Sequence, residues 1–190
     1  MLRSMIALSL FAAPAAALAQ QSAPASPATG DWGIAALPNG CMVQAVSPGG
    51  TMLSIWGFAG EDKLAFLLQN PSWKSIRDGG DYDIRVDFLG VRTMPVDATP
   101  KQNIDSDGPG FLFTVQPGAG TGTGFIDAFA TASGMRIVRD GESVDTLPLA
   151  GSRGAMAALA RCLADKWSAA APAQAAEEDA AAAKTISDAI

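Results

Sequence analysis

The sequence predicts an α+β fold, mainly antiparallel β-sheet arranged as a sandwich or a partly closed barrel, with one short helix and a C-terminal helix. Three observations predict it. Short runs in which apolar and polar residues alternate, as in half-buried strands, recur along the chain. Turn signals rich in glycine separate these runs. Residues 152–167 instead repeat their apolar side chains with helical spacing.

The first half of the predicted domain reads as strands. Residues 41–58, CMVQAVSPGGTMLSIWGF, form a hairpin around the turn signal SPGG. The run LAFLLQN at 64–70 is assigned to a strand because it is too short for a typical helix. Apolar and charged residues alternate strictly in DYDIRVDFLG at 81–90, which predicts an antiparallel strand with one wet face. The segment VRTMPVD at 91–97 is expected to pair with it.

The second half mixes strand and helix signals. Residues 111–115 predict another strand. A short helix is expected in GFIDAFATASG at 124–134, with Phe125, Ile126 and Phe129 on one side and with its terminal glycine as the stop. The following residues, 135–149, form a hairpin because Asp140-Gly141 is a strong turn signal between two alternating runs.

The C-terminal helix is predicted to begin at Ser152, a favourable N-cap residue, and to run to about Trp167. Pro172 is expected to stop it. Cys162 lies on the flank of its apolar stripe and is expected to face the sheet. The stripe consists of Met156, Leu159, Leu163 and Trp167.

The chain is predicted to place one domain between two terminal segments. Residues 1–19 resemble a signal peptide, with Arg3 before an apolar run and small residues at the cleavage site, so no integral membrane segment is expected after cleavage. Residues 20–30 lack charge and are expected to form a disordered linker. Residues 31–169 form a single β-rich domain. An alanine-rich flexible tail is expected at 170–190, because no apolar stripe is present to dock it.

The two cysteines, Cys41 and Cys162, are predicted to form a disulfide, since exported proteins reside in oxidising compartments, here the periplasm or the exterior. Two buried free thiols or two reactive thiols are the alternatives. A zinc site needs about four ligands, and a cysteine nucleophile normally needs a histidine partner. The chain contains two cysteines and no histidine.

Composition excludes several classes of function. The formal net charge is −6 and no basic cluster is present, which argues against nucleic-acid binding. Without histidine the chain cannot assemble a Ser-His-Asp triad or a His-containing metal site. No cofactor, catalytic residue or firm metal site is predicted from these letters.

One weak metal candidate is the segment NIDSDG. Asn103, Asp105 and Asp107 fall at the first, third and fifth positions of a calcium-binding loop. Thr114 occupies the twelfth position, where a bidentate carboxylate is expected. Asx and glycine turn chemistry ahead of a strand explains the same residues without a metal.

The sequence NPSWKSIRDGG suggests a partner contact. Trp73 lies in a loop-like stretch beside Lys74 and Arg77, and an exposed aromatic ring with two cations would suit a glycan, peptide or protein partner. The alternative is that the tryptophan anchors the loop by packing on the sheet.

Carboxylates provide the remaining catalytic hypothesis. A glycan hydrolase that uses only acids needs two of them about 5–10 Å apart in a groove. The candidates are Asp81, Asp83, Asp87 and Asp127.

A resemblance to a known family rests on the two ends of the domain. The chain has GDWGIA at residues 30–35, then Cys41, and closes with GFIDAFATASGMRIVRDG and LPLAGSRGAMAALARC. These segments resemble the invasion-associated locus B family of small exported proteins from Gram-negative bacteria. The resemblance implies a periplasmic or surface-associated β-rich protein without known catalysis.

The sequence therefore supports two hypotheses for function. The first is an exported, non-enzymatic binding or envelope-associated protein whose partner is a protein or glycan of the envelope. The alternative is a carboxylate-dependent hydrolase that acts on a glycan or another envelope component.

Overall fold

The computed structural model describes the backbone of residues 32–104 and 108–187, with side chains up to residue 169. Its described part contains ten strands in two antiparallel sheets, together with two helices. The expected fold class, α+β with mainly antiparallel sheet and one short and one C-terminal helix, is confirmed. The arrangement is that of a sandwich, because neither sheet closes into a barrel.

The larger sheet, sheet A, has six strands in the order β1-β2-β3-β4-β8-β7. Consecutive strands from β1 to β4 are joined by short turns, and β8 returns beside β4 after the chain has visited the other sheet. The strands are β1 (Gly33–Leu37), β2 (Gly40–Val46), β3 (Met52–Phe58), β4 (Leu64–Gln69), β7 (Thr99–Lys101) and β8 (Gly110–Val115).

The smaller sheet, sheet B, has four strands in the order β10-β9-β5-β6. The predicted turn between its last two strands is confirmed, because Asp140 and Gly141 both have positive φ angles, 53° and 86°. A two-residue turn of this kind matches the twist of the strands that it joins. The strands are β5 (Ile84–Phe88), β6 (Arg92–Pro95), β9 (Gly134–Arg139) and β10 (Glu142–Pro148).

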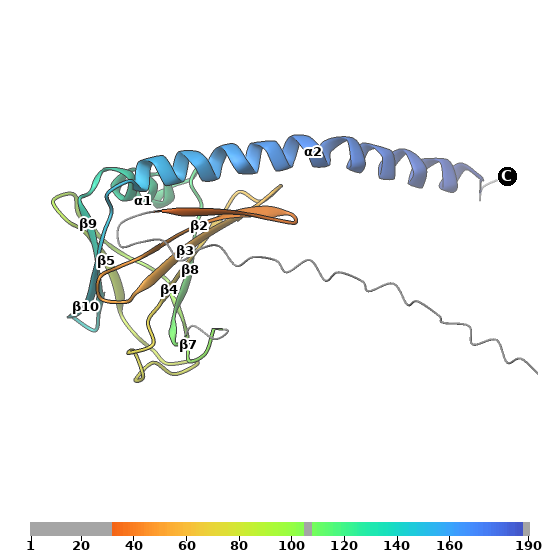
Figure 1. Cartoon of the computed structure of the whole chain (residues 1–190). Coiled ribbons are helices and arrows are strands. Elements are labelled where there is room, and N and C mark those ends of the chain that lie inside the picture. The colour runs from red at the N-terminus through yellow and green to blue at the C-terminus, as the bar shows by residue number, and fades with distance from the viewer. Residues whose placement is uncertain (1–31, 105–107, 188–190) are drawn as a thin grey trace, which may run out of the picture.

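The helices are α1 (Thr121–Thr131) and α2 (Ser152–Ser187). The first part of α2 contacts β1, β2, β3 and α1, and its later part extends past the sheets (Figure 1). Sheet A is therefore covered on its inner face by α2 at one end, while α1 and sheet B cover the other end.

The sequence did not predict two edge strands, β1 and β7. β1 is built largely of glycine and alanine, which have low strand propensity, and β7 has only three residues. Both are defined by pairing with a neighbour, β1 with β2 and β7 with β8. With them, the described residues contain ten strands.

The predicted stop of the short helix at Gly134 is wrong. α1 ends at Thr131, and Ala132 already has an extended backbone. Gly134 is instead the first residue of β9, where a Cβ atom would lie 3.0 Å from the Leu89 side chain. The glycine is therefore explained by close packing against a neighbouring turn rather than by a helix cap.

The core joins the two sheets through a cluster of phenylalanines. Phe66 of sheet A packs on Phe125 and Phe129 of α1, with ring centroids 5.2 and 5.8 Å apart. Phe88 of sheet B approaches Phe125 at 4.9 Å from the opposite side. Edge-to-face pairs of this kind add stabilisation beyond the area that they bury. Phe113 stacks on Phe66 at 5.3 Å and completes the cluster.

Two corrections concern α2. Ala155 donates its backbone N–H to the carbonyl of Gly151, so Gly151 occupies the cap position and the predicted N-cap, Ser152, is the first helical residue. The Ser152 hydroxyl donates instead to the carbonyl of Phe129 at 2.8 Å and ties α2 to α1.

The prediction that Pro172 ends the helix is also wrong, since α2 continues to Ser187. Alanine, the strongest helix former, surrounds the proline on both sides.

The apolar stripe of α2 packs on sheet A at a glycine. A Cβ atom on Gly57 of β3 would lie 2.5 Å from Leu163 Cδ1, so only glycine permits this approach. Leu159 is 1% exposed and belongs to the core. Trp167, at the end of the predicted stripe, packs beside Gly60 and is 52% exposed.

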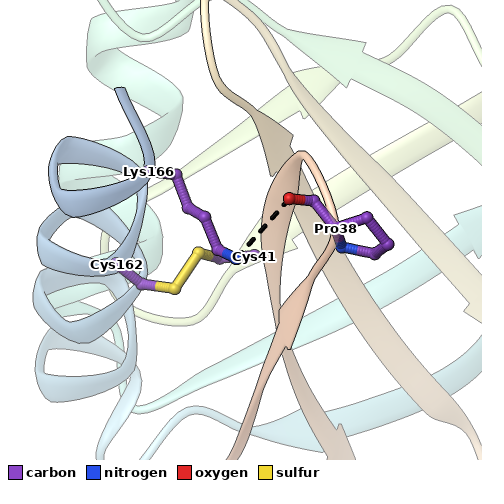
Figure 2. The surroundings of a disulfide bond; sticks show 4 residues. All are labelled: Pro38, Cys41, Cys162 and Lys166. Atoms are coloured by element: carbon purple, nitrogen blue, oxygen red, sulfur yellow. Dashed lines mark hydrogen bonds between the residues drawn. A yellow bond between two sulfur atoms is a disulfide. The ribbon is translucent and has the colours of Figure 1, made fainter. Parts of the chain in front are cut away.

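A disulfide fixes the same helix covalently. Cys41 of β2 and Cys162 of α2 are bonded, with their Cα atoms 6.1 Å apart, so the predicted pair is confirmed (Figure 2). The Cys41 side chain is fully buried. One turn further along the helix, Lys166 Nζ donates to the carbonyl of Pro38 at 3.5 Å (Figure 2).

A polar network holds the β2–β3 turn against sheet B. Asp145, at the bulge in β10, accepts hydrogen bonds from the hydroxyls of Ser47, at 3.0 Å, and Thr51. Asn70 donates to Thr51 Oγ1 at 2.9 Å and to the carbonyl of Gly49 at 3.0 Å. Both hydroxyl residues are buried, so one carboxylate satisfies two groups that water does not reach.

Replacing both cysteines, Cys41→Ser with Cys162→Ser, should lower the free energy of unfolding by about 4–5 kcal/mol, because the bond closes a loop with a sequence separation of 121. Urea unfolding followed by circular dichroism measures the difference. Wild-type protein unfolded with a reductant should give the value of the double variant. A loss below about 1 kcal/mol would show that the bond adds little to stability.

Asp145→Ala should lower the free energy of unfolding by about 1–3 kcal/mol, because the buried hydroxyls of Ser47 and Thr51 lose their acceptor. Asp127→Ala removes an exposed carboxylate from α1 and should change it by no more than about 0.5 kcal/mol. Equal effects from the two variants would contradict a structural role for the network.

Candidate functional site

The predicted partner contact at Trp73 is not an exposed aromatic surface. The Trp73 side chain is 8% exposed and belongs to the core, with its ring centroid 5.9 Å from that of Phe111 on β8. The expectation of an exposed ring is therefore wrong, and the tryptophan anchors its loop to sheet A. This is the alternative that the sequence also allowed, in which the ring packs on the sheet.

The two cations beside Trp73 do remain exposed. Arg77 donates from its guanidinium to the carbonyls of Lys74 and of Ile76, the latter at 3.0 Å. These contacts hold the arginine against its own loop. Lys74 is exposed on the same loop. With the ring buried, the predicted combination of aromatic face and two cations does not form.

The weak calcium candidate lies largely outside the described residues. Asp105 and Asp107 are not part of the described chain, whereas Asn103 is described and exposed. Within the described ranges, His, Cys, Asp and Glu nowhere gather in groups of three that could hold a metal ion.

Three of the four acids of the hydrolase hypothesis lie on β5 or just before it, and the fourth lies on α1. Asp83 accepts from Arg85 at 2.9 Å, and Asp87 forms an ion pair with Arg136 at 3.6 Å. Asp83 lies just before β5 and Asp87 lies on its exposed side, and each carboxylate is paired with an arginine. Asp81 is exposed ahead of the strand, and Asp127 is exposed on α1.

A different surface, missed in the sequence, is the outer face of sheet A. Residues that alternate with the core positions of β2, β3, β4 and β8 point away from α2 and sheet B. Such a face normally carries polar residues when it meets water. Here the register sets Met42 beside Trp56, Trp56 beside Ala65, and Leu67 beside Leu112. The outer face is therefore apolar around these residues, although Gln44, Ser54 and Thr114 lie on the same face.

This face is hollowed into a groove of about 570 Å³, here called the outer groove. Ala65 and Leu67 of β4 and Leu112 of β8 line it centrally. Trp56 and Phe58 of β3 line it on one side, and Phe58 is 42% exposed. On the other side the lining consists of Lys101, Asn103 and Ile104, and Leu37 completes it beside the aromatic rings.

The wall that follows β7 is fixed by hydrogen bonds. Gln69 donates from its side-chain amide to the carbonyl of Ile104 at 2.9 Å. The backbone N–H of Gln102 donates to Asp78 at 2.8 Å, and that of Ile104 to the carbonyl of Gly108 at 3.2 Å. The exposed side chains of Lys101 and Asn103 are therefore carried by an ordered backbone.

A second groove, of about 590 Å³, lies between α2, α1 and the β3–β4 turn. Leu64, Met156 and Leu163 contribute to its apolar lining. Its charged rim is engaged within the protein, because Lys63 pairs with Glu61 at 3.9 Å and Asp62 accepts from Gln116. These three charged residues thus have partners within the protein, and the other residues that line this groove have no polar side chain.

One sequence signal could have located the outer groove. MLSIWGF in β3 and LAFLLQ in β4 carry apolar residues at successive positions, not only at alternate ones. Strands of that composition are typical of sheets with two apolar faces. The signal predicts an apolar outer face but not its hollow, which depends on the loop that follows β7.

Comparison of the chain with known protein families, curated proteins and solved structures gave no match. The resemblance to the invasion-associated locus B family therefore stays a prediction. Of the helices in the described part of the chain, neither combines the length and apolar character needed to cross a membrane.

Trp73→Ala should lower the free energy of unfolding by about 3–5 kcal/mol, because the ring is part of the core beside Phe111. Lys74→Ala, next to it in the loop, should change the value by no more than about 0.5 kcal/mol. Thermal or urea unfolding measures both. A stable Trp73→Ala protein would restore the ring as a candidate for partner contact.

Proposed function

We propose that this protein is exported and acts in the periplasm or outside the cell as a non-enzymatic binding domain for a component of the cell envelope. The disulfide between Cys41 and Cys162 supports an oxidising compartment. The leader-like residues 1–19, which lie outside the described chain, support export.

The observation that carries the binding function is the apolar outer face of sheet A. An apolar surface with a hollow of several hundred Å³ is typical of binding sites for ligands or partners. Trp56 and Phe58 supply the aromatic contacts on which such sites depend. The binding surface proposed here is thus the outer groove and not the Trp73 loop.

The distribution of acids favours binding over hydrolysis. Hydrolysis by carboxylates requires two of them to converge on one bond. Asp83 and Asp87 are four residues apart along the extended chain of β5, and at about 3.3 Å per residue their Cα atoms are about 13 Å apart. Each has an arginine at hydrogen-bonding or ion-pairing distance.

A site-specific photo-crosslinker tests the proposed surface. p-Benzoylphenylalanine in place of Phe58 should crosslink the mature protein to an envelope component in intact cells, because Phe58 lines the outer groove. The matched control is the same group in place of Val91, which is 45% exposed in the turn between β5 and β6.

Products formed at position 58 alone, and lost on addition of Trp56→Lys, support the proposed function. Equal products at both positions, or none at 58, would contradict it. The mass of the purified mature protein tests export independently, since removal of residues 1–19 leaves Gln20 at the N-terminus.

A further inference from the structure

The lining of the outer groove is polar at one side only. Seven of its nine residues are apolar, and the two with polar side chains, Lys101 and Asn103, lie together at the β7 side. Trp56 and Phe58 lie across the groove from them on β3. A ligand that matches this lining has a long apolar part and one polar end.

The groove has a defined reach across the sheet. β4 and β8 separate β3 from β7. The register pairs Lys101 with Gly110, Gly110 with Gln69 and Gln69 with Met52, so Trp56 lies four residues further along β3 than the position level with Lys101. With neighbouring strands about 4.8 Å apart and a rise of about 3.3 Å per residue, the Cα atoms of Trp56 and Lys101 are separated by about 20 Å. This span and a volume of about 570 Å³ suit one extended hydrocarbon chain with a head group.

The chemistry of the polar side defines the charge of that head group. The Lys101 ammonium donates hydrogen bonds and accepts none, and the Asn103 amide supplies further donors. A carboxylate or phosphate accepts from both and is attracted by the ammonium charge. A cationic head group would be repelled by Lys101.

Other ligand classes fit the groove less well. A glycan is held by many directed hydrogen bonds, and here only two of the nine lining residues have polar side chains. A peptide strand binds through the backbone at a sheet edge, whereas the outer groove lies on the face of sheet A over β4 and β8.

We propose that the outer groove binds a single-chain amphiphile with an anionic head group, such as a fatty-acid carboxylate. The acyl chain lies over Ala65, Leu67 and Leu112 against the aromatic rings, and the head group meets Lys101 and Asn103. This inference rests on the proposed function, because it names the ligand class of the same surface.

Isothermal titration of the mature, disulfide-bonded protein below the micelle concentration tests the proposal with two probes of equal chain length. Dodecanoate should bind at least tenfold more tightly than dodecyltrimethylammonium. Lys101→Glu should reverse that order, because the negative side chain would repel the anionic head group and attract the cationic one. Arg153→Glu makes the same charge change on an exposed face of α2 and should leave the order unchanged.

A second variant tests the acyl site separately. Ala65→Trp fills the middle of the groove and should weaken both probes at least tenfold while the melting temperature stays within a few degrees. If this variant does not fold, the Lys101→Glu reversal alone decides the matter. Equal affinities for the two probes in the wild type, or affinities that Lys101→Glu does not alter, would overturn the proposal.

The two proposals fail in different ways. If dodecanoate does not bind but crosslinks still form specifically at position 58, the binding surface is right and the ligand class is wrong. If dodecanoate binds and no crosslinked envelope component is found, the groove holds a small amphiphile and the proposed binding of an envelope component is wrong.

Discussion

The contact on which the structure depends most is the packing of Phe66 against the two phenylalanines of α1. It brings one strand of sheet A, one short helix and, through Phe88, one strand of sheet B into a single buried cluster. This cluster and α2 cover the inner face of sheet A. Its outer face is left with the apolar residues of β3 and β4, so the position of the candidate site follows from how the core is assembled.

Local features of the sequence predicted most of the strands and their turns. In β5 the alternation of buried and exposed residues matches the alternation of apolar and charged residues in the sequence. Asp140-Gly141 adopts the turn conformation with positive φ angles that these residue types favour. The disulfide between the two cysteines was predicted from the expected oxidising compartment and from the absence of histidine. These inferences need only near neighbours in the chain or the composition of the whole, which is why a single sequence supports them.

The sequence alone could not decide several features that depend on contacts between remote residues. Trp73 is buried because Phe111 lies above it, and β1 exists because β2 offers an unpaired edge. α2 extends through Pro172, and alanine, the residue of highest helix propensity, lies on both sides of the proline. The outer groove needs the register of three strands and the loop at Ile104, and neither can be inferred from composition.

The disulfide also determines how the protein would respond to mechanical force. Cys41 lies in β2, near the start of the described residues, and Cys162 lies in α2, the last described element. A pull applied to the two ends of the chain is therefore carried by the sulfur–sulfur bond, and the segment between the cysteines bears almost none of it. A protease cut within that segment would likewise leave both pieces covalently joined. Strands β3 to β10 lie wholly within this covalent loop, whereas β1 and the C-terminal part of α2 lie outside it.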